Sequence, residues 1–285
     1  MRARVFVVLQ YLLPRHWLTA IVWRVARIRH TPTKNFLITR FARAFDVDLE
    51  EVKLEVPDDF ATFNDFFVRE LKEGAREIDD DDHALVSPVD GTVSAAGRIG
   101  GDTIFQAKGL DYSLDDLLAT DLDEAAHYID GRFATIYLAP YNYHRVHAPL
   151  AGELVAARYV PGDLFSVNEA TTQLVPGLFA RNERVICHFS SELGPMAVIL
   201  VGAIFVGSIE TVWHGEVHAQ RGQPTKWVYR GDKRLRFDAG AEIGRFNMGS
   251  TVIILLPAGS AAWADALGPG SPLRMGQAIG KPLRP

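Results

Sequence analysis

From residue 85 onward, the chain consists of short apolar runs that are separated by glycine and proline. Runs of this length, bounded by turn-forming residues, are typical of strands in a β-rich structure. The clearest of them are residues 134–138, 154–160, 197–201, 204–206, 226–229 and 251–256. Residues 88–93 and 148–154 resemble each other as turns that lead into strands. We therefore predict a compact barrel or sandwich for this part of the chain.

The first 80 residues have a different pattern, which predicts helices. From Trp17 to Ile28, the apolar residues fall on one helical face, and Arg24 and Arg27 lie outside it. The acidic run Asp79–Asp82 follows, and we interpret it as a solvated connection, not as a metal site. The predicted fold class is α+β, with a helical region at residues 1–80 and a β-rich domain at residues 81–285.

Charge is distributed unevenly along the chain. Residues 1–45 contain nine lysines and arginines and no acidic residue. The net charge of the whole chain is −5, so removing these nine positive charges leaves −14 on the rest. A basic helix with a tryptophan on its apolar face is typical of a helix that lies in a membrane interface, where it is attracted to anionic phospholipid. The alternative, a helix packed on its own domain with a solvated basic edge, stays open.

A spanning helix or a cleaved leader fits the N-terminal segment less well. The apolar run from Val5 to Leu13 is interrupted only by Gln10 and is far shorter than the ~20 residues of a spanning helix. It lacks a small-residue cleavage site before Pro14, which disfavours a signal peptide. A mitochondrial transit peptide is not excluded by charge, but the segment is poor in serine. We therefore predict peripheral attachment to a membrane.

Several classes of function are disfavoured by what the sequence lacks. Cys187 is the single cysteine, so no internal disulfide can form, and its strand-like surroundings indicate a buried structural residue. The sequence has no glycine-rich phosphate loop or CxxC pair, and its negative charge argues against a nucleic-acid partner. The His144/His147 pair has no matched second pair at zinc-like spacing. His214 and His218 have helical pair spacing but lie in a strand-like segment, and we interpret them as surface histidines, so we expect no metal.

Gly249-Ser250-Thr251 stands between a stretch at residues 242–248 and the apolar run at 252–256. Glycine places no Cβ in the path of the Ser250 hydroxyl and tolerates the backbone angles that attack on its own carbonyl requires. A serine at this place is therefore a candidate for cutting the chain with its own side chain. The alternative is a turn that feeds a strand.

A reactive serine needs a base, and histidine is the usual one at neutral pH. A carboxylate then fixes the histidine tautomer and stabilises the imidazolium. Asp90, His147 and Ser250 supply these three groups in chain order, although Asp90 also fits a turn and the histidines also fit a strand end.

The chain resembles the phosphatidylserine decarboxylase family, in its bacterial, membrane-associated and pyruvoyl-dependent form. The similarity extends through most of the chain, with one departure, Met248, where the family usually has leucine. Both side chains are apolar and similar in volume, so the exchange is expected to be mild. The matching segments are residues 63–71, 87–91, 106–114, 141–149, 161–168, 178–184, 206–213 and 249–250.

The resemblance implies that His147, held by Asp90, deprotonates Ser250, which attacks the Gly249 carbonyl and forms an ester. Elimination and hydrolysis then leave a pyruvoyl group at position 250 and two associated chains, residues 1–249 and 250–285. The pyruvoyl carbonyl forms a Schiff base with phosphatidylserine, which loses carbon dioxide and becomes phosphatidylethanolamine in phospholipid biosynthesis. His144 is the candidate acid that protonates the resulting carbanion.

The resemblance also implies a peripheral position on the cytoplasmic face of the bacterial cell membrane, and it leaves a homo-oligomer open. Two other interpretations remain. One is a membrane-associated serine hydrolase that uses Asp90, His147 and Ser250 on lipid esters, although Ser250 lacks the Gly-x-Ser-x-Gly elbow. The other is a non-enzymatic membrane adaptor in which the three residues only form turns or pack.

Overall fold

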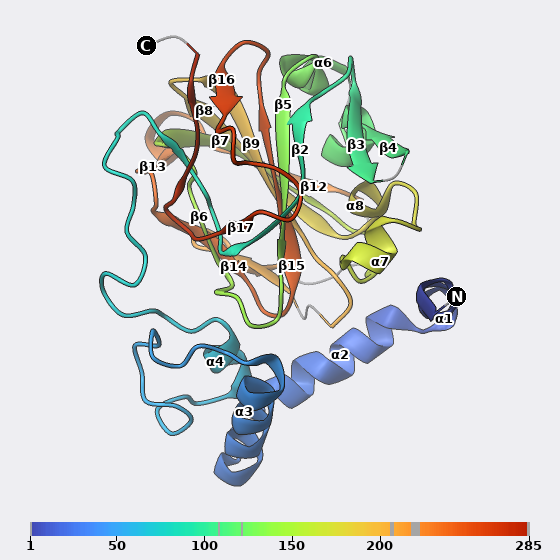
Figure 1. Cartoon of the computed structure of the whole chain (residues 1–285), viewed down its shortest axis with the longest axis vertical. Coiled ribbons are helices and arrows are strands. Elements are labelled where there is room, and N and C mark those ends of the chain that lie inside the picture. The colour runs from blue at the N-terminus through green and yellow to red at the C-terminus, as the bar shows by residue number, and fades with distance from the viewer. Residues whose placement is uncertain (1, 108, 121, 206–207, 218–222, 284–285) are drawn as a thin grey trace.

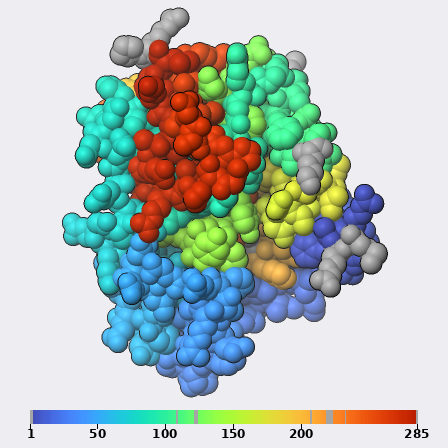
Figure 2. Space-filling view, viewed as in Figure 1, coloured from blue at the N-terminus to red at the C-terminus, as the bar shows by residue number. Residues whose placement is uncertain are grey.

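The computed structural model describes residues 2–107, 109–120, 122–205, 208–217 and 223–283 of the 285 residues. Helices make up the N-terminal end and strands dominate the remainder, which confirms the predicted α+β class (Figure 1). The helical region lies along one end of the β-rich part, while the last described residues lie at the opposite end. Figure 2 shows the N-terminal residues, in blue, as one continuous part of the surface.

Four helices form the N-terminal region: α1 (Arg2–Leu12), α2 (Arg15–Ala26), α3 (Thr31–Phe45) and α4 (Phe63–Phe67). Helix α2 covers most of the predicted apolar face and ends two residues early. Helix α3 ends at Phe45 and is capped by Asp46, which adopts a left-handed conformation. Thr62 caps α4 by accepting from the Asp65 N–H. The α3 and α4 side chains share a small aromatic core.

The helical prediction for all of residues 1–80 is wrong between α3 and α4 and again after α4. Residues 46–62 form turns and irregular backbone, in which Val52 forms a β-bridge with Leu71 and Pro57 has no N–H to donate to a helix. Residues 68–84 are mostly extended or turns and include the exposed run Asp79–Asp82.

No single helix in the described part of the chain is long and apolar enough to cross a membrane. Two consecutive segments, Ala3–Leu12 and Arg15–Ala26, reach that length and composition only together, and they are bent by 89° at their junction.

The largest sheet has the strand order β12-β7-β8-β9-β15-β5-β2-β17, with β13 pairing to β7, and its neighbours are antiparallel. Strand β15 lies at its centre, and all seven of its residues are buried. In sheet order the strands are β12 (Thr225–Val228), β7 (Gly152–Val160), β8 (Arg184–Ser191), β9 (Gly194–Val201), β15 (Ser250–Leu256), β5 (Arg132–Leu138), β2 (Gly91–Arg98) and β17 (Pro272–Leu273), with β13 at Leu235–Phe237.

Among the described residues, three smaller sheets accompany the large one. They have the orders β11-β10-β14-β6, β1-β18-β16 and β3-β4. Their strands are β11 (Gly215–Val217), β10 (Ile209–Thr211), β14 (Glu242–Phe246), β6 (Arg145–His147), β1 (Leu85–Val86), β18 (Ala278–Pro282), β16 (Ala261–Trp263), β3 (Thr103–Ala107) and β4 (Leu110–Ser113). Within the described residues no sheet closes on itself, so the architecture is layered and not a barrel.

Short helical turns lie in the connections between strands. They are α5 (Leu114–Leu118), α6 (Leu122–Ala125), α7 (Glu169–Thr172), α8 (Leu178–Arg181) and the 3₁₀ turns Ala126–Tyr128 and Gly231–Lys233.

Five of the six apolar runs form strands as predicted, and the run at 204–206 does not. Ile204 and Phe205 lie in a turn, and Val206 is outside the described residues. Phe205 has a left-handed φ of 68°, and its N–H donates to Thr19 of α2. This turn carries the chain from the large sheet to the four-stranded sheet, so it cannot continue either strand.

One face of the large sheet packs on the four-stranded sheet. Leu200 of β9 pairs with Val252 of β15, and its side chain reaches Gly244 of β14. A Cβ at Gly244 would lie 2.5 Å from the Glu210 carbonyl oxygen, so only glycine allows this close approach. Because alternate residues of a strand share a face, Ser250 points to the same side as Val252, between the two sheets.

Candidate active site

Ser250 is the first residue of β15 and is fully buried. It pairs with Leu138 of β5, and its Oγ has no hydrogen-bond partner. Gly249 has a φ of 20°, and a Cβ there would meet open space, so backbone conformation and not crowding favours glycine. Burying a hydroxyl group without a hydrogen-bond partner costs free energy, because the group loses its hydrogen bonds to water. A buried polar group of this kind calls for an explanation, and Ser250 is therefore a candidate functional residue.

His147 ends β6 and is nearly buried. Its Nδ1 lies 2.7 Å from the Gly240 carbonyl oxygen and must donate to it, because a carbonyl oxygen only accepts. Nε2 therefore carries the lone pair and accepts from the Tyr143 hydroxyl at 3.1 Å. Burial lowers the pKa of His147, although the Gly240 carbonyl and Glu242 oppose the shift. His147 is thus a neutral base at neutral pH.

His144 is also a neutral imidazole with a free Nε2. Its Nδ1 donates to the Asn142 carbonyl at 2.8 Å, and its buried Nε2 has no partner. Burial, assisted by the positive charge of Arg69, lowers the pKa of His144 to about 3. The Phe67 ring of α4 lies against it, with 4.1 Å between ring centroids.

Asp90 follows a turn directly before β2 and is 5% exposed. Its carboxylate accepts two hydrogen bonds from Arg76, at 2.8 and 2.5 Å, and one from the Met275 N–H at 2.9 Å. Arg76 also pairs with Glu51 at 2.8 Å. Burial disfavours the charge of Arg76, but its hydrogen bonds to these two carboxylates outweigh burial and raise its pKa.

The structure brings the segments of Asp90 and His147 together. The His147 N–H donates to the Pro88 carbonyl at 2.8 Å, and the charge of Asp90 raises the pKa of His147. The hydrogen bonds of the two side chains go elsewhere, however, and Ser250 Oγ has no partner. In the uncut chain, a backbone carbonyl orients His147, and the predicted hydrogen-bonded set of three is not assembled.

The buried pair between Asp90 and Arg76 gives a prediction for stability. Asp90→Ala removes one partner of a nearly buried ion pair, and we expect the free energy of unfolding to fall by about 3 kcal/mol, because Arg76 keeps its second pair. Urea unfolding of chains that also carry Ser250→Ala, and so stay uncut, measures this. Lys53→Ala, which removes the exposed pair with Glu70, should cost less than about 1 kcal/mol. Equal losses for both variants would contradict the prediction.

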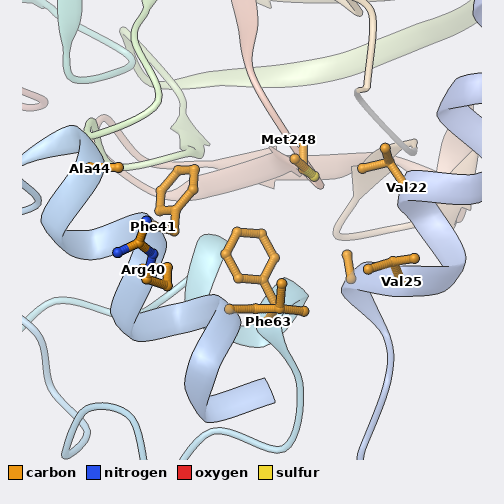
Figure 3. A pocket seen from close by; sticks show the side chains of 9 residues that line it. Val22, Val25, Arg40, Phe41, Ala44, Phe63 and Met248 are labelled. Atoms are coloured by element: carbon orange, nitrogen blue, oxygen red, sulfur yellow. The ribbon is translucent and has the colours of Figure 1, made fainter. Parts of the chain in front are cut away.

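An apolar cavity of about 470 Å³ lies between α2, α3, α4 and the residue two positions before Ser250 (Figure 3). Figure 3 shows Met248 above the cavity, with Phe41 and Phe63 on one side and Val22 and Val25 on the other. Its lining residues are Val22, Val25, Ala26, Leu37, Arg40, Phe41, Ala44, Phe63 and Met248.

Some residues at the site were not singled out by the sequence reasoning. Arg69, which is 4% exposed, donates from Nη2 to the Tyr141 and Asn142 carbonyls at 2.9 and 3.3 Å and so holds the loop before His144. Arg76 forms hydrogen bonds with Asp90, and the Tyr143 hydroxyl forms one with His147. Arg69 and Tyr143 lie inside matching segments, but no sequence pattern shows which side chains they meet.

The remaining candidates lie apart from this chemistry. Cys187 is buried in β8, as predicted, and burial raises the pKa of its thiol. His214 is exposed in a turn, and His218 lies outside the described residues. No group of three or more potential ligands among the described histidines, cysteines and acidic residues is placed to hold a metal ion.

A buried serine after a left-handed glycine, in a chain that also holds two buried neutral histidines, defines a candidate self-processing enzyme. The sequence model of the family described as phosphatidylserine decarboxylase matches residues 63–281, and a second, described as PSD, matches residues 5–46. The chain belongs to the phosphatidylserine decarboxylase family.

Curated relatives extend over nearly the whole chain, and each of three is named phosphatidylserine decarboxylase proenzyme. The protein of Methylococcus capsulatus is 51% identical over 278 residues, which cover 97% of this chain and 96% of the relative. That of Azotobacter vinelandii is 49% identical, with 99% of both chains covered. That of Pseudomonas aeruginosa is 48% identical, with 98% and 97% covered. The chain is therefore an enzyme of this type, and the resemblance noted in the sequence is confirmed.

Proposed function

We propose that this chain is the precursor of a pyruvoyl-dependent enzyme that converts phosphatidylserine to phosphatidylethanolamine and carbon dioxide. It cuts itself between Gly249 and Ser250, and the products, residues 1–249 and 250–285, stay associated. The observation that carries the proposal is the buried Ser250 hydroxyl without a partner, in a chain whose relatives are named proenzymes.

The surroundings of Ser250 fit a pyruvoyl group. Its hydroxyl makes no hydrogen bond, so its conversion to a carbonyl breaks none. Strand β15 pairs on both sides, with β5 and β9, and these ladders hold the new chain end in the core after cleavage. When formed, the group supplies an electrophilic carbonyl and an electron sink for decarboxylation.

His147 is the base for the first step. Nε2 accepts the Ser250 proton, Oγ attacks the Gly249 carbonyl carbon, and the Ser250 nitrogen leaves with the returned proton to give an ester. In the uncut chain the Tyr143 hydroxyl donates to Nε2 of His147, so this hydrogen bond must break before Nε2 can accept the Ser250 proton. The Asp90 charge favours the imidazolium through space, since its carboxylate is hydrogen-bonded to Arg76.

His144 remains the candidate for proton delivery to the substrate carbon. With Nδ1 committed to Asn142, only Nε2 is free, and in the uncut chain it is an acceptor. His144 must therefore take up a proton on Nε2 before it can act as an acid. A substrate ammonium group provides such a proton.

The apolar cavity suits part of a lipid acyl chain. Its volume of about 470 Å³ falls within the range of small-molecule sites, and its lining is almost entirely aliphatic and aromatic. Met248 lines the cavity and is two residues before Ser250, so an acyl chain that enters here with its head group toward Met248 would place that head group near the cleavage site.

The N-terminal helices present an apolar and basic surface to a membrane. Leu12 is 75% exposed and Trp17 65% exposed, and the side chains of Arg4 and Arg24 are also exposed. Further exposed apolar side chains are Val5, Phe6, Val8, Leu9, Tyr11, Leu13, Ile21, Val25 and Phe36. Such an area is unusual on a protein surface that faces only water, and it supports peripheral attachment to a membrane. The cytoplasmic face of a bacterial membrane is the side that the family resemblance implies.

Leu12→Glu and Trp17→Glu test the membrane surface. Transferring one such side chain to lipid contributes about 1.5–3 kcal/mol, so each variant should bind vesicles roughly 10–100-fold more weakly. Sedimentation with vesicles of phosphatidylcholine and phosphatidylglycerol measures binding, and added salt should weaken it further. Val228→Glu, at a 48% exposed apolar site on β12, should bind like wild type. Equal vesicle binding by all variants would contradict membrane attachment through this surface.

The reaction itself is tested with phosphatidylserine in detergent micelles. We expect release of carbon dioxide and formation of phosphatidylethanolamine by protein that has been cut at 249/250. Release of fatty acid by uncut protein would instead identify a serine hydrolase, and the absence of both products would favour a membrane adaptor.

A further inference from the structure

Glu183, Gly202 and Ser250 form a row across three neighbouring strands. The Gly202 N–H donates to the Glu183 carbonyl at 2.8 Å, which extends the β8–β9 ladder by one pair. Thr251 pairs with Val201, so Ser250 stands opposite Gly202, one residue beyond the last β9–β15 pair. Residues that are paired across antiparallel strands project from the same face. Glu183 and Ser250 therefore share one face, with a glycine between them.

The Glu183 carboxyl lies over that glycine. Its Oε1 is 3.5 Å from the position that a Cβ at Gly202 would occupy, and Oε1 has no hydrogen-bond partner. Oε2 accepts from the Tyr159 hydroxyl at 3.0 Å. Glu183 is 1% exposed, and burial raises the pKa of its carboxyl to about 7, so near neutrality a large fraction can accept a proton. The side of the carboxyl without a partner thus lies over the glycine that separates Glu183 from Ser250.

The directions of the Gly202 N–H and C=O groups determine which atom of Ser250 faces Gly202. Gly202 uses its N–H toward Glu183 on β8, and its carbonyl accepts from Asn182 on the same side. The pair with Ser250 is therefore of the non-hydrogen-bonded kind, in which the Cα atoms are about 4.5 Å apart and the Cα–H groups face each other. The Ser250 Cα–H points toward Gly202 and the carboxyl above it.

We propose that Glu183 is the base that removes the Cα proton of Ser250 in the elimination step of self-cleavage, an inference that rests on the proposed function. Once the Gly249–Ser250 ester exists, Glu183 Oε1 accepts the Cα proton. The Cα–H electron pair becomes the Cα=Cβ double bond. The Cβ–Oγ bond breaks, and its electrons leave with the Gly249 carboxylate. Residues 1–249 are released from the covalent chain, and position 250 becomes dehydroalanine.

A base separate from His147 is needed because the two protons of Ser250 point in different directions. The hydroxyl proton is on the side chain, whereas the Cα proton lies between β15 and β9. His147 and His144 belong to the four-stranded sheet and its entry, and their Nδ1 atoms are committed to backbone carbonyls. Glu183 belongs to the β8 side of the large sheet.

Glu183→Gln tests the proposal, because glutamine keeps the shape and can still accept from Tyr159 but is not a base. We expect the ester to form and the elimination to slow by roughly 10²–10⁴-fold. The purified variant should stay at full length in neutral buffer. Hydroxylamine should cut its ester and give a 1–249 hydroxamate and a 250–285 peptide with an N-terminal serine, both identified by mass spectrometry.

Gly202→Ala is the second variant. Its methyl would lie at ordinary van der Waals distance, 3.5 Å, from Glu183, so the fold should accept it, but it would stand between the carboxyl and Ser250. We expect slow elimination and the same hydroxylamine-sensitive ester. Glu192→Gln changes an exposed carboxyl on the β8–β9 turn and should process normally.

Each outcome separates this inference from the proposed function. A wild-type chain that never cuts itself contradicts the proposed function. A wild type that cuts itself, beside a Glu183→Gln chain that does so at the same rate, overturns only the role of Glu183. A Glu183→Gln chain that is uncut and resists hydroxylamine also overturns it, because the block then precedes the ester.

Discussion

Ser250→Ala is expected to yield a single chain of full length, 31.6 kDa by mass, with no decarboxylase activity. Alanine has no oxygen to attack the Gly249 carbonyl, so neither the ester nor the cofactor forms. We expect activity to fall by at least roughly 10³-fold, to the background of the assay. Intact mass spectrometry of wild type should show a second chain of 36 residues, roughly 4 kDa by its share of the length.

The mass of the small chain carries the chemical information. Conversion of an N-terminal serine to pyruvoyl removes the elements of one ammonia, so the fragment should be lighter than the serine peptide by about 17 mass units. Ser260→Ala, in the same small chain, changes a hydroxyl that bonds to the Pro257 carbonyl and should process normally. Cutting of the Ser250→Ala chain at 249/250 would exclude Ser250 as the nucleophile.

His147→Gln is expected to slow self-cleavage by roughly 10²–10⁴-fold, because the amide cannot take the Ser250 proton. The time course of conversion to two chains, followed by gel electrophoresis, measures the rate. His214→Gln, at an exposed histidine that stacks on Trp227, should cut at the wild-type rate. A His147→Gln chain that matures normally would leave His144, whose Nε2 has no partner, as the base.

The pH dependence of self-cleavage follows from the burial of His147. Burial lowers its pKa, so the imidazole stays neutral and basic below the ordinary value of 6.5. We expect the rate of the ester-forming step, followed as hydroxylamine-sensitive ester in the Glu183→Gln chain, to fall on the acid side only at a pH below 6.5. The unfolded chain takes up the proton first as pH falls, so His147 also lowers the stability of the uncut fold in acid. A midpoint above 6.5 would contradict a buried, neutral base.

Much of the fold was predictable because it depends on local periodicity. The alternation and length of apolar runs predicted β5, β7, β9, β12 and β15, and the helical face predicted α2. The strand prediction for residues 204–206 was wrong, because an apolar run that connects two sheets has the same sequence pattern as a run inside one sheet. The helical prediction for residues 46–62 was wrong, because the bridge from this segment to Leu71 depends on a contact between separate segments and not on local periodicity.

The site shows the same division. Ser250, Gly249, His144 and His147 could be chosen from the sequence, because each residue type brings a definite chemistry and each lies in a segment that resembles the family. The hydrogen-bond partners of these residues could not be predicted from the sequence. Asp90 bonds to Arg76, and His147 bonds to Gly240, which is 93 residues away in the chain.

The sequence by itself therefore determined the chemistry that is available: a serine after a glycine, two histidines, a carboxylate and an apolar, basic N-terminus. Tertiary structure alone decided which groups meet, that both histidines are neutral with Nε2 as the basic atom, and that Glu183 and Ser250 share a face across Gly202. The physical reason is that protonation depends on burial and hydrogen bonding, and both are set by strand pairing between distant segments.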